Sequence, residues 1–326
     1  MEYFSTLCYH YIRPLNDLDP FKKLLGSSEE EFYNHLEILS KNYEFITLND
    51  AYDFLYHNKS KQTDKPCLLL TFDDGLSDHY LAAKILSEFN ASGVFFIPTC
   101  ILQNHEPANP TIIHYGIAKY GITNFLEEYH NILDEKNLNN KIYNISYEKG
   151  MDSGIDIIKK IKLNFKYLLN YLDGRSILLL IYQRLILKEY SNALEIMHLT
   201  EQQICKMKSM GHSFGTHTHT HISVSPTQLT NKQQELELVM PKQILENILD
   251  QSVISFSYPY GESKDRFKPN TIIDSLKIYK LIFTVEEKNN FTNTSPFSIG
   301  RYQPMSNVTS STLLNKLTSI SKNIVN

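Results

Sequence analysis

The 326-residue chain is longer than one average domain, but its length suits a barrel that carries an insertion. Its 42% hydrophobic and 21% charged residues are typical of a globular protein that buries a full core. The formal net charge of -4 and the pI near 6.3 argue against nucleic acid as a partner. The most hydrophobic stretch, residues 177–187, contains Gln183 and Arg184 and is too short for a membrane span.

The first ten residues lack a positively charged region, a long apolar region and a small-residue cleavage site. We therefore expect a cytoplasmic location. The four cysteines, Cys8, Cys67, Cys100 and Cys205, are scattered and form no CxxC pair, which predicts reduced and buried thiols rather than a disulfide framework.

Strand and helix patterns alternate strictly in the first hundred residues. The helix expected over residues 29–41 begins with a capping box, Ser28 and Glu31, ahead of an apolar stripe. The other expected elements are strands over 6–12, 43–48, 68–72 and 93–98 and helices over 49–55 and 77–89. This alternation predicts a parallel sheet covered or closed by helices.

Residues 104–197 show helical periodicity and no convincing strand, so we expect an all-helical insertion placed where barrel loops tolerate growth. Alternation resumes with a helix that Thr200 caps and Gly211 ends. It continues with a His-rich strand, a helix over 231–249, a strand over 253–261, a helix over 272–279, strands over 281–285 and 298–302 and a helix over 310–324. The prediction is a distorted (β/α) barrel of about seven strands, built from residues 1–103 and 198–326, with 104–197 inserted.

Two adjacent carboxylates, Asp73 and Asp74, end the apolar run Leu68–Phe72 and precede Gly75. A buried parallel strand that delivers acids to its carboxyl end is typical of an active site in α/β proteins. A strand followed by a simple Asp-Gly turn is the structural alternative.

A histidine cluster, His217-Thr218-His219-Thr220-His221, lies far along the chain. On a helix, His217 and His221 would share one face, while on a strand His219 would join them. One Asp and two His leave an open coordination position, which is the arrangement of a catalytic metal site. The alternative is a solvated His/Thr turn.

The combination Thr71-Phe72-Asp73-Asp74-Gly75, His217-Thr218-x-x-His221 and Phe256-x-Tyr258-Pro259-Tyr260-Gly261 resembles the polysaccharide deacetylase family, the NodB-homology or carbohydrate esterase family 4 domain. The resemblance covers residues 3–103 and 198–305 but not the insertion, and its first two motifs are the specific ones.

The resemblance implies a metal-dependent N-deacetylase of an N-acetylated sugar. Asp74, His217 and His221 would bind a divalent ion, usually Zn²⁺, with Co²⁺ or Ni²⁺ also used. Asp73 would be the general base, because a metal polarises the acetamide carbonyl and lowers the pKa of water while a free carboxylate removes its proton. The backbone N–H of Tyr260 is the family's candidate for stabilising the oxyanion.

The chain departs from the family pattern in three ways. No histidine follows His221, so the usual general acid of a late strand is missing; His10, in a Tyr-His element like that of the biofilm poly-N-acetylglucosamine deacetylases, either replaces it or merely packs under the rim. Ser257 follows Phe256 where the family has a base-orienting arginine, and the chain has no tryptophan for an Asp-Trp element.

Arg301 either supplies the missing positive charge to Asp73 or is a surface arginine. His79 and His219 are interpreted as flanking residues, and His212 as a surface group.

The expected function is removal of an N-acetyl group from an amino sugar, polymeric or linked to a nucleotide or lipid, in surface glycan synthesis. Three alternatives remain at this stage: a deformylase or other amidase on the same scaffold, a carbohydrate-binding pseudoenzyme, and an interaction scaffold built on the insertion. Protein partners are not indicated by the sequence.

Overall fold

The computed structural model describes residues 2–14, 19–138, 140–224, 229–267, 274–304 and 308–322. The parts of the expected helices at 272–273 and 323–324 lie outside these ranges. No helix in the described ranges combines the length and hydrophobicity needed to cross a bilayer.

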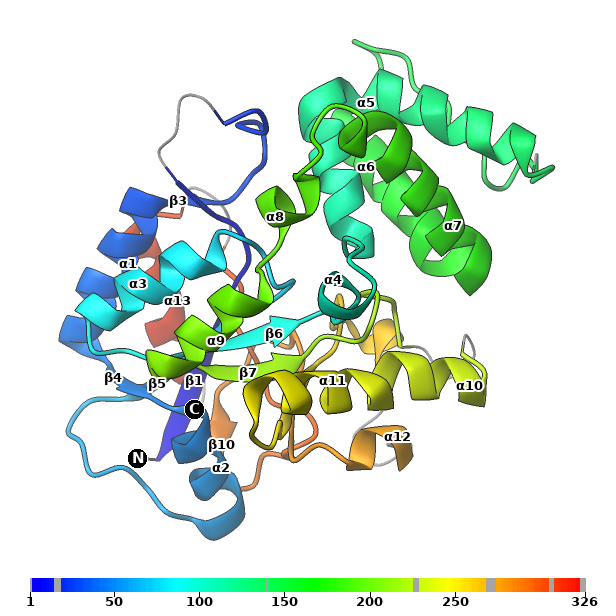
Figure 1. Cartoon of the computed structure of the whole chain (residues 1–326). Coiled ribbons are helices and arrows are strands. Elements are labelled where there is room, and N and C mark those ends of the chain that lie inside the picture. The colour runs from blue at the N-terminus through cyan, green and yellow to red at the C-terminus, as the bar shows by residue number, and fades with distance from the viewer. Residues whose placement is uncertain are drawn as a thin grey trace.

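One curled sheet organises the barrel, and six of its strands run parallel in the order β1, β5, β6, β7, β8, β9 (Figure 1). These strands are β1 Tyr3–Tyr9, β5 Cys67–Phe72, β6 Gly93–Ile97, β7 Ser213–Thr216, β8 Ser255–Ser257 and β9 Leu281–Phe283. Two shorter strands complete the sheet: β4 (Glu44–Ile46) pairs with β5 in parallel, and β10 (Asn290–Phe291) pairs with β1 antiparallel. A further small sheet joins β2 (Ile12–Arg13) to β3 (Ser27–Ser28).

The segment 299–302 lies between the two ends of the parallel sheet. Ile299 bridges Phe283 of β9, and Tyr302 bridges Leu7 of β1. Hydrogen bonds of 2.9 Å from the Thr284 N–H to the Ile299 carbonyl and 2.7 Å from the Tyr302 N–H to the Thr6 carbonyl support these contacts. The expected last strand is therefore reduced to two single bridges, yet it closes the ring, and the prediction of a distorted (β/α) barrel is confirmed.

Both faces of the central strands are buried, as their continuous apolar sequences predict. Every residue of β5 is buried. On one face Leu69 packs with Phe96 and Phe283 in a cluster inside the barrel. On the other face Leu70 joins a larger cluster with residues of the surrounding helices. A shift of the β5 pairing register by one residue would exchange the side chains of these two faces. The packing of both faces therefore fixes the register of β5 and, with it, the position of the residues that follow this strand.

Helices cover the outside of the barrel, and their starts follow the expected caps. Ser28 and Thr200 each form a capping box, with Glu31 and Gln203 respectively. The covering helices are α1 Glu29–Asn42, α2 Leu48–His57, α3 His79–Glu88, α9 Glu201–Ser209, α12 Asp274–Lys277 and α13 Ser310–Lys322. The helix expected over 231–249 is also present, as α10 Asn231–Gln234, a π-helical turn η3 Glu235–Val239, and α11 Met240–Leu249.

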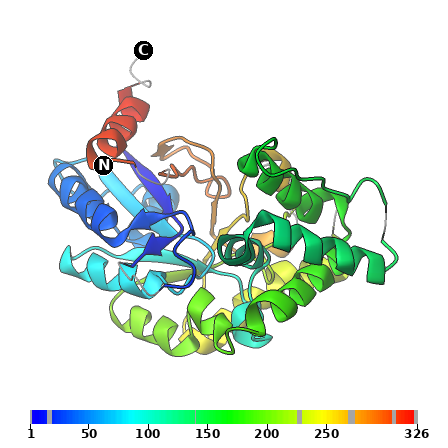
Figure 2. The ribbon, with the colours of Figure 1, turned by 90° about the horizontal axis from the view of Figure 1, so that it is seen from above.

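Between β6 and α9 the described chain consists of helices and loops, apart from two isolated bridges, Lys149 with Asp152 and His198 with Leu76, as expected of an all-helical insertion. Its elements are α4 Cys100–Gln103, α5 Asn109–Glu135, α6 Gly154–Leu163, η1 Asn164–Leu168, α7 Tyr171–Ile181, η2 Tyr182–Leu187 and α8 Ala193–Met197. Most of these helices form a layer beside the sheet rather than around it (Figures 1 and 2). Their core also receives Tyr11, Phe21 and Leu76 from the barrel, which ties the two parts together.

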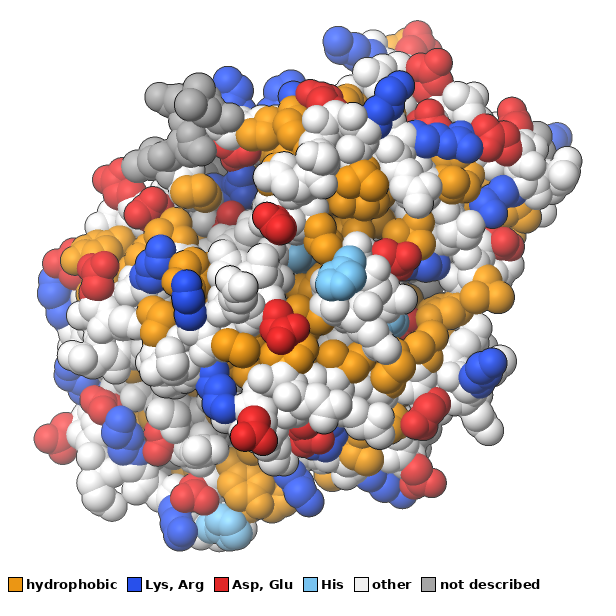
Figure 3. Space-filling view, in the orientation of Figure 1, with side chains coloured by type: hydrophobic (Ala, Val, Ile, Leu, Met, Phe, Trp, Pro, Cys, Tyr) orange, Lys and Arg blue, Asp and Glu red, His pale blue; other side chains and the backbone are white. Residues whose placement is uncertain are grey.

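Two predictions about surface and thiols need correction. His212 is buried rather than exposed, because its Nδ1 accepts the Gly93 N–H (3.1 Å) while its Nε2 lies 3.1 Å from the Ala83 carbonyl. Cys205 is exposed on α9, whereas the other three cysteines are buried and all four are free. Elsewhere, Figure 3 shows acidic and basic side chains interspersed over one face of the molecule.

Candidate active site

The sequence motifs meet at one edge of the sheet because parallel strands all present their carboxyl ends there. Asp73 and Asp74 follow β5, the histidine cluster follows β7, and Tyr260 follows β8. Arg301 reaches the same place from the segment that closes the ring. The topology thus brings together residues more than 200 positions apart.

Asp74 lies against two imidazoles. Its Oδ1 is 2.9 Å from His221 Nε2 and 3.3 Å from His217 Nε2, and all three side chains are buried. Burial opposes the ionised form of Asp74, but the two neighbouring imidazoles hold its pKa well below the usual range. The three predicted ligands therefore form one compact group, with ligand atoms within 4.8 Å of one another.

The histidine cluster is neither a strand nor a helix, so both predicted geometries are wrong. Strand β7 ends at Thr216, and Thr218 and His221 adopt left-handed φ values of 59° and 63°. The Thr218 hydroxyl accepts the His221 N–H at 2.9 Å and closes a tight loop. This loop turns His217 and His221 toward each other, with ring centroids 4.7 Å apart.

A buried carboxylate, Glu237 of η3, holds this loop in place. It accepts the backbone N–H groups of His219 and Thr220, each at 2.9 Å, and the Thr220 hydroxyl at 2.8 Å. The side chain of His219 turns away from Asp74 and lies 2.9 Å from the Thr99 hydroxyl. His219 is therefore a loop residue and not a third imidazole ligand.

The three buried side chains fit a divalent cation. His217 Nδ1 donates to the Ser257 carbonyl at 2.8 Å, which fixes the tautomer that leaves Nε2 free to bind a metal. Asp74 Oδ1 makes no hydrogen bond to any described residue although it is fully enclosed, and such a buried, unbonded oxygen calls for a cation. One carboxylate and two imidazoles suit Zn²⁺, Co²⁺ or Ni²⁺.

The neighbouring Asp73 is held by Arg301 in a bidentate ion pair with two N–O distances of 2.7 Å. Arg301 is fully buried, so its alternative interpretation as a surface arginine is wrong. Its Nε also donates to the Thr284 carbonyl at 2.9 Å, which fixes the plane of the guanidinium. Burial raises the pKa of Asp73, but the charge and hydrogen bonds of Arg301, together with the nearby His217, outweigh burial and lower this pKa far below the usual value.

Two residues beside Asp73 were missed at the sequence level. The Ser257 hydroxyl donates to Asp73 Oδ2 at 3.2 Å and accepts from Arg301 at 2.8 Å, while its carbonyl orients His217. The Cys8 thiol lies 3.5 Å from the same carboxylate oxygen. The polar alternation Ser255, Ser257 in a buried strand was the available signal for Ser257, because a buried hydroxyl needs a partner.

His10 lines the same cleft as the insertion's lysines, and one ring nitrogen is within 4.8 Å of both a carboxylate oxygen of Asp73 and the Cys8 thiol. Its side chain is partly exposed, with Nδ1 3.4 Å from the Gln303 amide. Its carbonyl is 3.0 Å from Nε2 of the buried His79, whose pKa burial lowers to about 4. His79 is thus neutral near pH 7 and supports His10 by a hydrogen bond.

Tyr260 stands next to the two imidazoles. Its φ of 63° is left-handed, and its ring meets that of His221 edge-on at 4.9 Å. The ammonium of Lys166, from η1 of the insertion, lies 4.1 Å from the Tyr260 ring centroid. The insertion therefore touches the catalytic edge directly.

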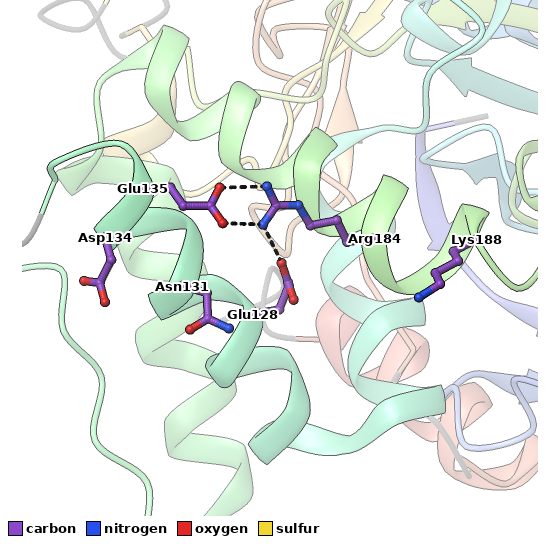
Figure 4. Close-up of a pocket in the computed structure, with 6 residues that line it drawn as sticks. All are labelled: Glu128, Asn131, Asp134, Glu135, Arg184 and Lys188. Atoms are coloured by element: carbon purple, nitrogen blue, oxygen red, sulfur yellow. Dashed lines mark hydrogen bonds and ion pairs between the residues drawn. The ribbon is translucent and has the colours of Figure 1, made fainter.

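A cleft of about 710 Å³ opens over these residues, and its walls come from both the barrel and the insertion. Its volume is that of a pocket for a small molecule or a short chain segment. Another hollow lies within the insertion, where Arg184 pairs with Glu135 and Glu128 and Lys188 lies nearby (Figure 4). That hollow holds surface ion pairs and contains none of the predicted catalytic residues.

A parallel barrel with a carboxylate, two imidazoles and a clamped second carboxylate at its carboxyl edge defines a hydrolase-type site on a (β/α) scaffold. Residues 60–276 match the family model described as polysaccharide deacetylase, and the chain belongs to this family. No curated protein sequence matches the chain.

Solved structures of deacetylases share the fold over nearly the whole chain. The Streptococcus pyogenes deacetylase PplD, in complex with acetate, has a TM-score of 0.58 and 19% identity, with 96% of this chain and 97% of that chain covered. IcaB from Ammonifex degensii has a TM-score of 0.54 and 16% identity, with 97% of each chain covered. A de-N-acetylase from Aggregatibacter actinomycetemcomitans has a TM-score of 0.53 and 14% identity, with 96% and 98% covered. At such low sequence identities, these structural similarities support a shared fold.

Proposed function

We propose that this protein is a metal-dependent hydrolase that removes the N-acetyl group from an amino sugar. Family membership supports sugar deacetylation as the reaction class. The observation that carries the proposal is the position of Asp74 Oδ1, buried and without a hydrogen bond between two imidazole nitrogens, directly beside the clamped carboxylate of Asp73.

Asp74, His217 and His221 would hold the cation. When bound, a divalent ion would supply Lewis-acid chemistry, polarising the acetamide carbonyl and making water easier to deprotonate. The residues around it prepare the site: Ser257 fixes the tautomer of His217, and Glu237 fixes the loop that carries both imidazoles.

Asp73 is the general base in this proposal. Arg301 keeps its carboxylate ionised and aims it, so that it can take a proton from the water that attacks the acetamide carbon. A carboxylate whose pKa is lowered in this way is a weak base. It suits a water molecule whose own pKa is lowered at the site.

His10 is the general acid that returns a proton to the departing amine, and its ring lies close to Asp73. Tyr260 has a left-handed backbone and its ring contacts that of His221; in this proposal its N–H donates to the oxygen of the acetamide as charge develops. The substrate in this proposal is an N-acetylated sugar, polymeric or linked to a nucleotide or lipid carrier, used in surface glycan synthesis.

The test is acetate release from a panel of N-acetylated sugars by the zinc-loaded protein and by an Asp73→Asn variant. Release that falls by about a hundredfold or more in the variant supports the proposal, because loss of a general base typically costs this much. Formate release from N-formyl sugars would instead indicate a deformylase. Bound metal with no release of either acid would indicate a carbohydrate-binding protein. An unaltered rate in His10→Ala would remove His10 from the general-acid role.

A further inference from the structure

The cleft is more basic than the chain as a whole. The chain has a formal net charge of -4 and interspersed surface charges (Figure 3), yet five lysines line the cleft. These are Lys23, Lys159, Lys162, Lys166 and Lys264. Against them stand three carboxylates, of which Asp73 is already neutralised by Arg301 and Asp74 faces the two imidazoles.

Most of these lysines already have a carboxylate partner. Lys166 pairs with the buried Asp265 at 2.7 Å, Lys159 with Asp156 at 3.3 Å, and Lys264 with Glu262 at 3.4 Å. Lys23 is exposed to solvent. Lys162, in the last turn of α6, is instead partly buried in the cleft wall, and it makes no ion pair or hydrogen bond with any described residue.

An unpaired cation in a partly buried place is costly. Burial lowers the pKa of Lys162, the Asp74 charge raises it, and the Lys166 charge lowers it. A divalent cation at the three ligands would offset the charge of Asp74, which leaves Lys162 facing further positive charge. The free protein therefore has an unmatched positive charge at the cleft wall, which an anionic group on a ligand would compensate.

Phosphate fits these side chains as that anionic group. The described lining contains lysines and no arginine, and an ammonium binds phosphate oxygens as a point charge, without the bidentate geometry by which a guanidinium holds carboxylate or phosphate. The exposed apolar residues Leu25 and Leu163 line the same cleft and would contact uncharged parts of the substrate.

We propose that the substrate is an N-acetylated sugar that carries a phosphate group, and that Lys162 of the insertion is the residue that pairs with this phosphate. The inference rests on the proposed deacetylase function and adds the substrate class. It makes the insertion, which the family motifs do not cover, a specificity-determining part of the site. Nucleotide-linked sugars, lipid-linked sugars and glycans joined by phosphodiesters share this chemistry.

The test compares kcat/KM of the zinc-loaded enzyme for N-acetylglucosamine 1-phosphate, a UDP-linked N-acetyl sugar, a lipid-linked N-acetyl sugar in detergent, and an uncharged N-acetyl oligosaccharide. Lys162→Met is expected to lower the ratio of phosphorylated over uncharged kcat/KM by about tenfold, mainly through KM, because a hydrogen-bonded charge pair with the ligand is lost. Lys162→Arg keeps the charge and should restore most of the ratio.

Lys160→Met is the matched control, since Lys160 is exposed on the same helix and does not line the cleft. It should leave the ratio at the wild-type value. Whichever phosphorylated substrate has the highest kcat/KM identifies the carrier, and any of the three supports the inference. Titration calorimetry of N-acetylglucosamine 1-phosphate with Asp73→Asn protein, with and without Lys162→Met, measures binding without turnover.

Failure of the two proposals would look different. Turnover of the uncharged sugar with the same ratio in wild type and Lys162→Met would overturn the phosphate inference and leave the deacetylase function standing. No acetate from any substrate would refute the deacetylase function. In that case calorimetry decides the inference: weaker binding in Lys162→Met supports it, and equal binding refutes it.

Discussion

The buried pair between Arg301 and Asp73 allows a sharp prediction, because the chain contains a second bidentate pair of almost the same geometry on its surface. Arg301 holds Asp73 with two contacts of 2.7 Å, and Arg184 holds Glu135 with contacts of 2.9 and 2.7 Å (Figure 4). The side chains of the first pair are 0% and 4% exposed, and those of the second are 36% and 53% exposed.

Arg301→Met should destabilise the protein by about 3–5 kcal/mol, since it leaves the charge of Asp73 buried without its partner. It also removes the donors that Thr284 and Ser257 now accept. Arg184→Met should have little measurable effect, because solvent screens the exposed pair. Urea unfolding of both variants, followed by circular dichroism, measures the difference.

The same substitution should change the pH dependence of activity. Burial raises the pKa of Asp73 and Arg301 lowers it, so without Arg301 this pKa rises. A base must be ionised, and the acid limb of the kcat/KM profile should therefore move to higher pH between about pH 4 and 8. The double variant Arg301→Met/Asp73→Met should be more stable than Arg301→Met alone, because it removes the unpaired charge. Equal unfolding free energies for Arg301→Met and Arg184→Met, or an unmoved acid limb, would refute this reasoning.

Three further predictions concern the cation and the histidines. Asp74→Asn should keep the fold but reduce bound zinc from about one ion per chain to nearly none, measured by mass spectrometry after dialysis; an unchanged zinc content would contradict the assigned ligands. Glu237→Gln, which keeps the shape but weakens an acceptor of two loop N–H groups, should lower zinc affinity about tenfold in a chelator competition, and equal affinity would show that the loop needs no such anchor. Burial lowers the pKa of His198 from 6.5 to about 4, so the unfolded chain takes up the proton first and up to about 3 kcal/mol of stability should be lost as the pH falls from 6.5 to 4. Unfolding of His198→Gln should lose less over that interval, and identical pH profiles would exclude His198 as the cause.

The strands and the adjacent carboxylates could be predicted from sequence because their signals are local. The apolar run before Asp73 is long enough to mark a strand buried on both faces, and Ser28 with Glu31 marks a helix start by a short-range hydrogen-bond exchange. The candidate Asp and His ligands could be named from the sequence because their residue types and the motif resemblance agreed.

The loop geometry at His217 and His221 could not be read from spacing. It depends on left-handed backbone at Thr218 and His221 and on a carboxylate, Glu237, that belongs to a later helix. His212 was misplaced for a similar reason, since its two partners, Gly93 and Ala83, come from distant segments. Long-range hydrogen bonds of this kind leave no periodic trace in the chain.

The buried Asp265 has a consequence for exchanging parts between family members. It accepts the hydroxyls of Tyr167 and Ser223 and pairs with Lys166, so it fastens η1 of the insertion to the loop just beyond His221. In a chimera whose helical insertion comes from another family member and lacks equivalents of Lys166 and Tyr167, the Asp265 carboxylate would be buried without its ion-pair partner beside the candidate active site. Transplanting the insertion together with residues 223 and 265 is therefore the smallest graft that we expect to preserve the barrel.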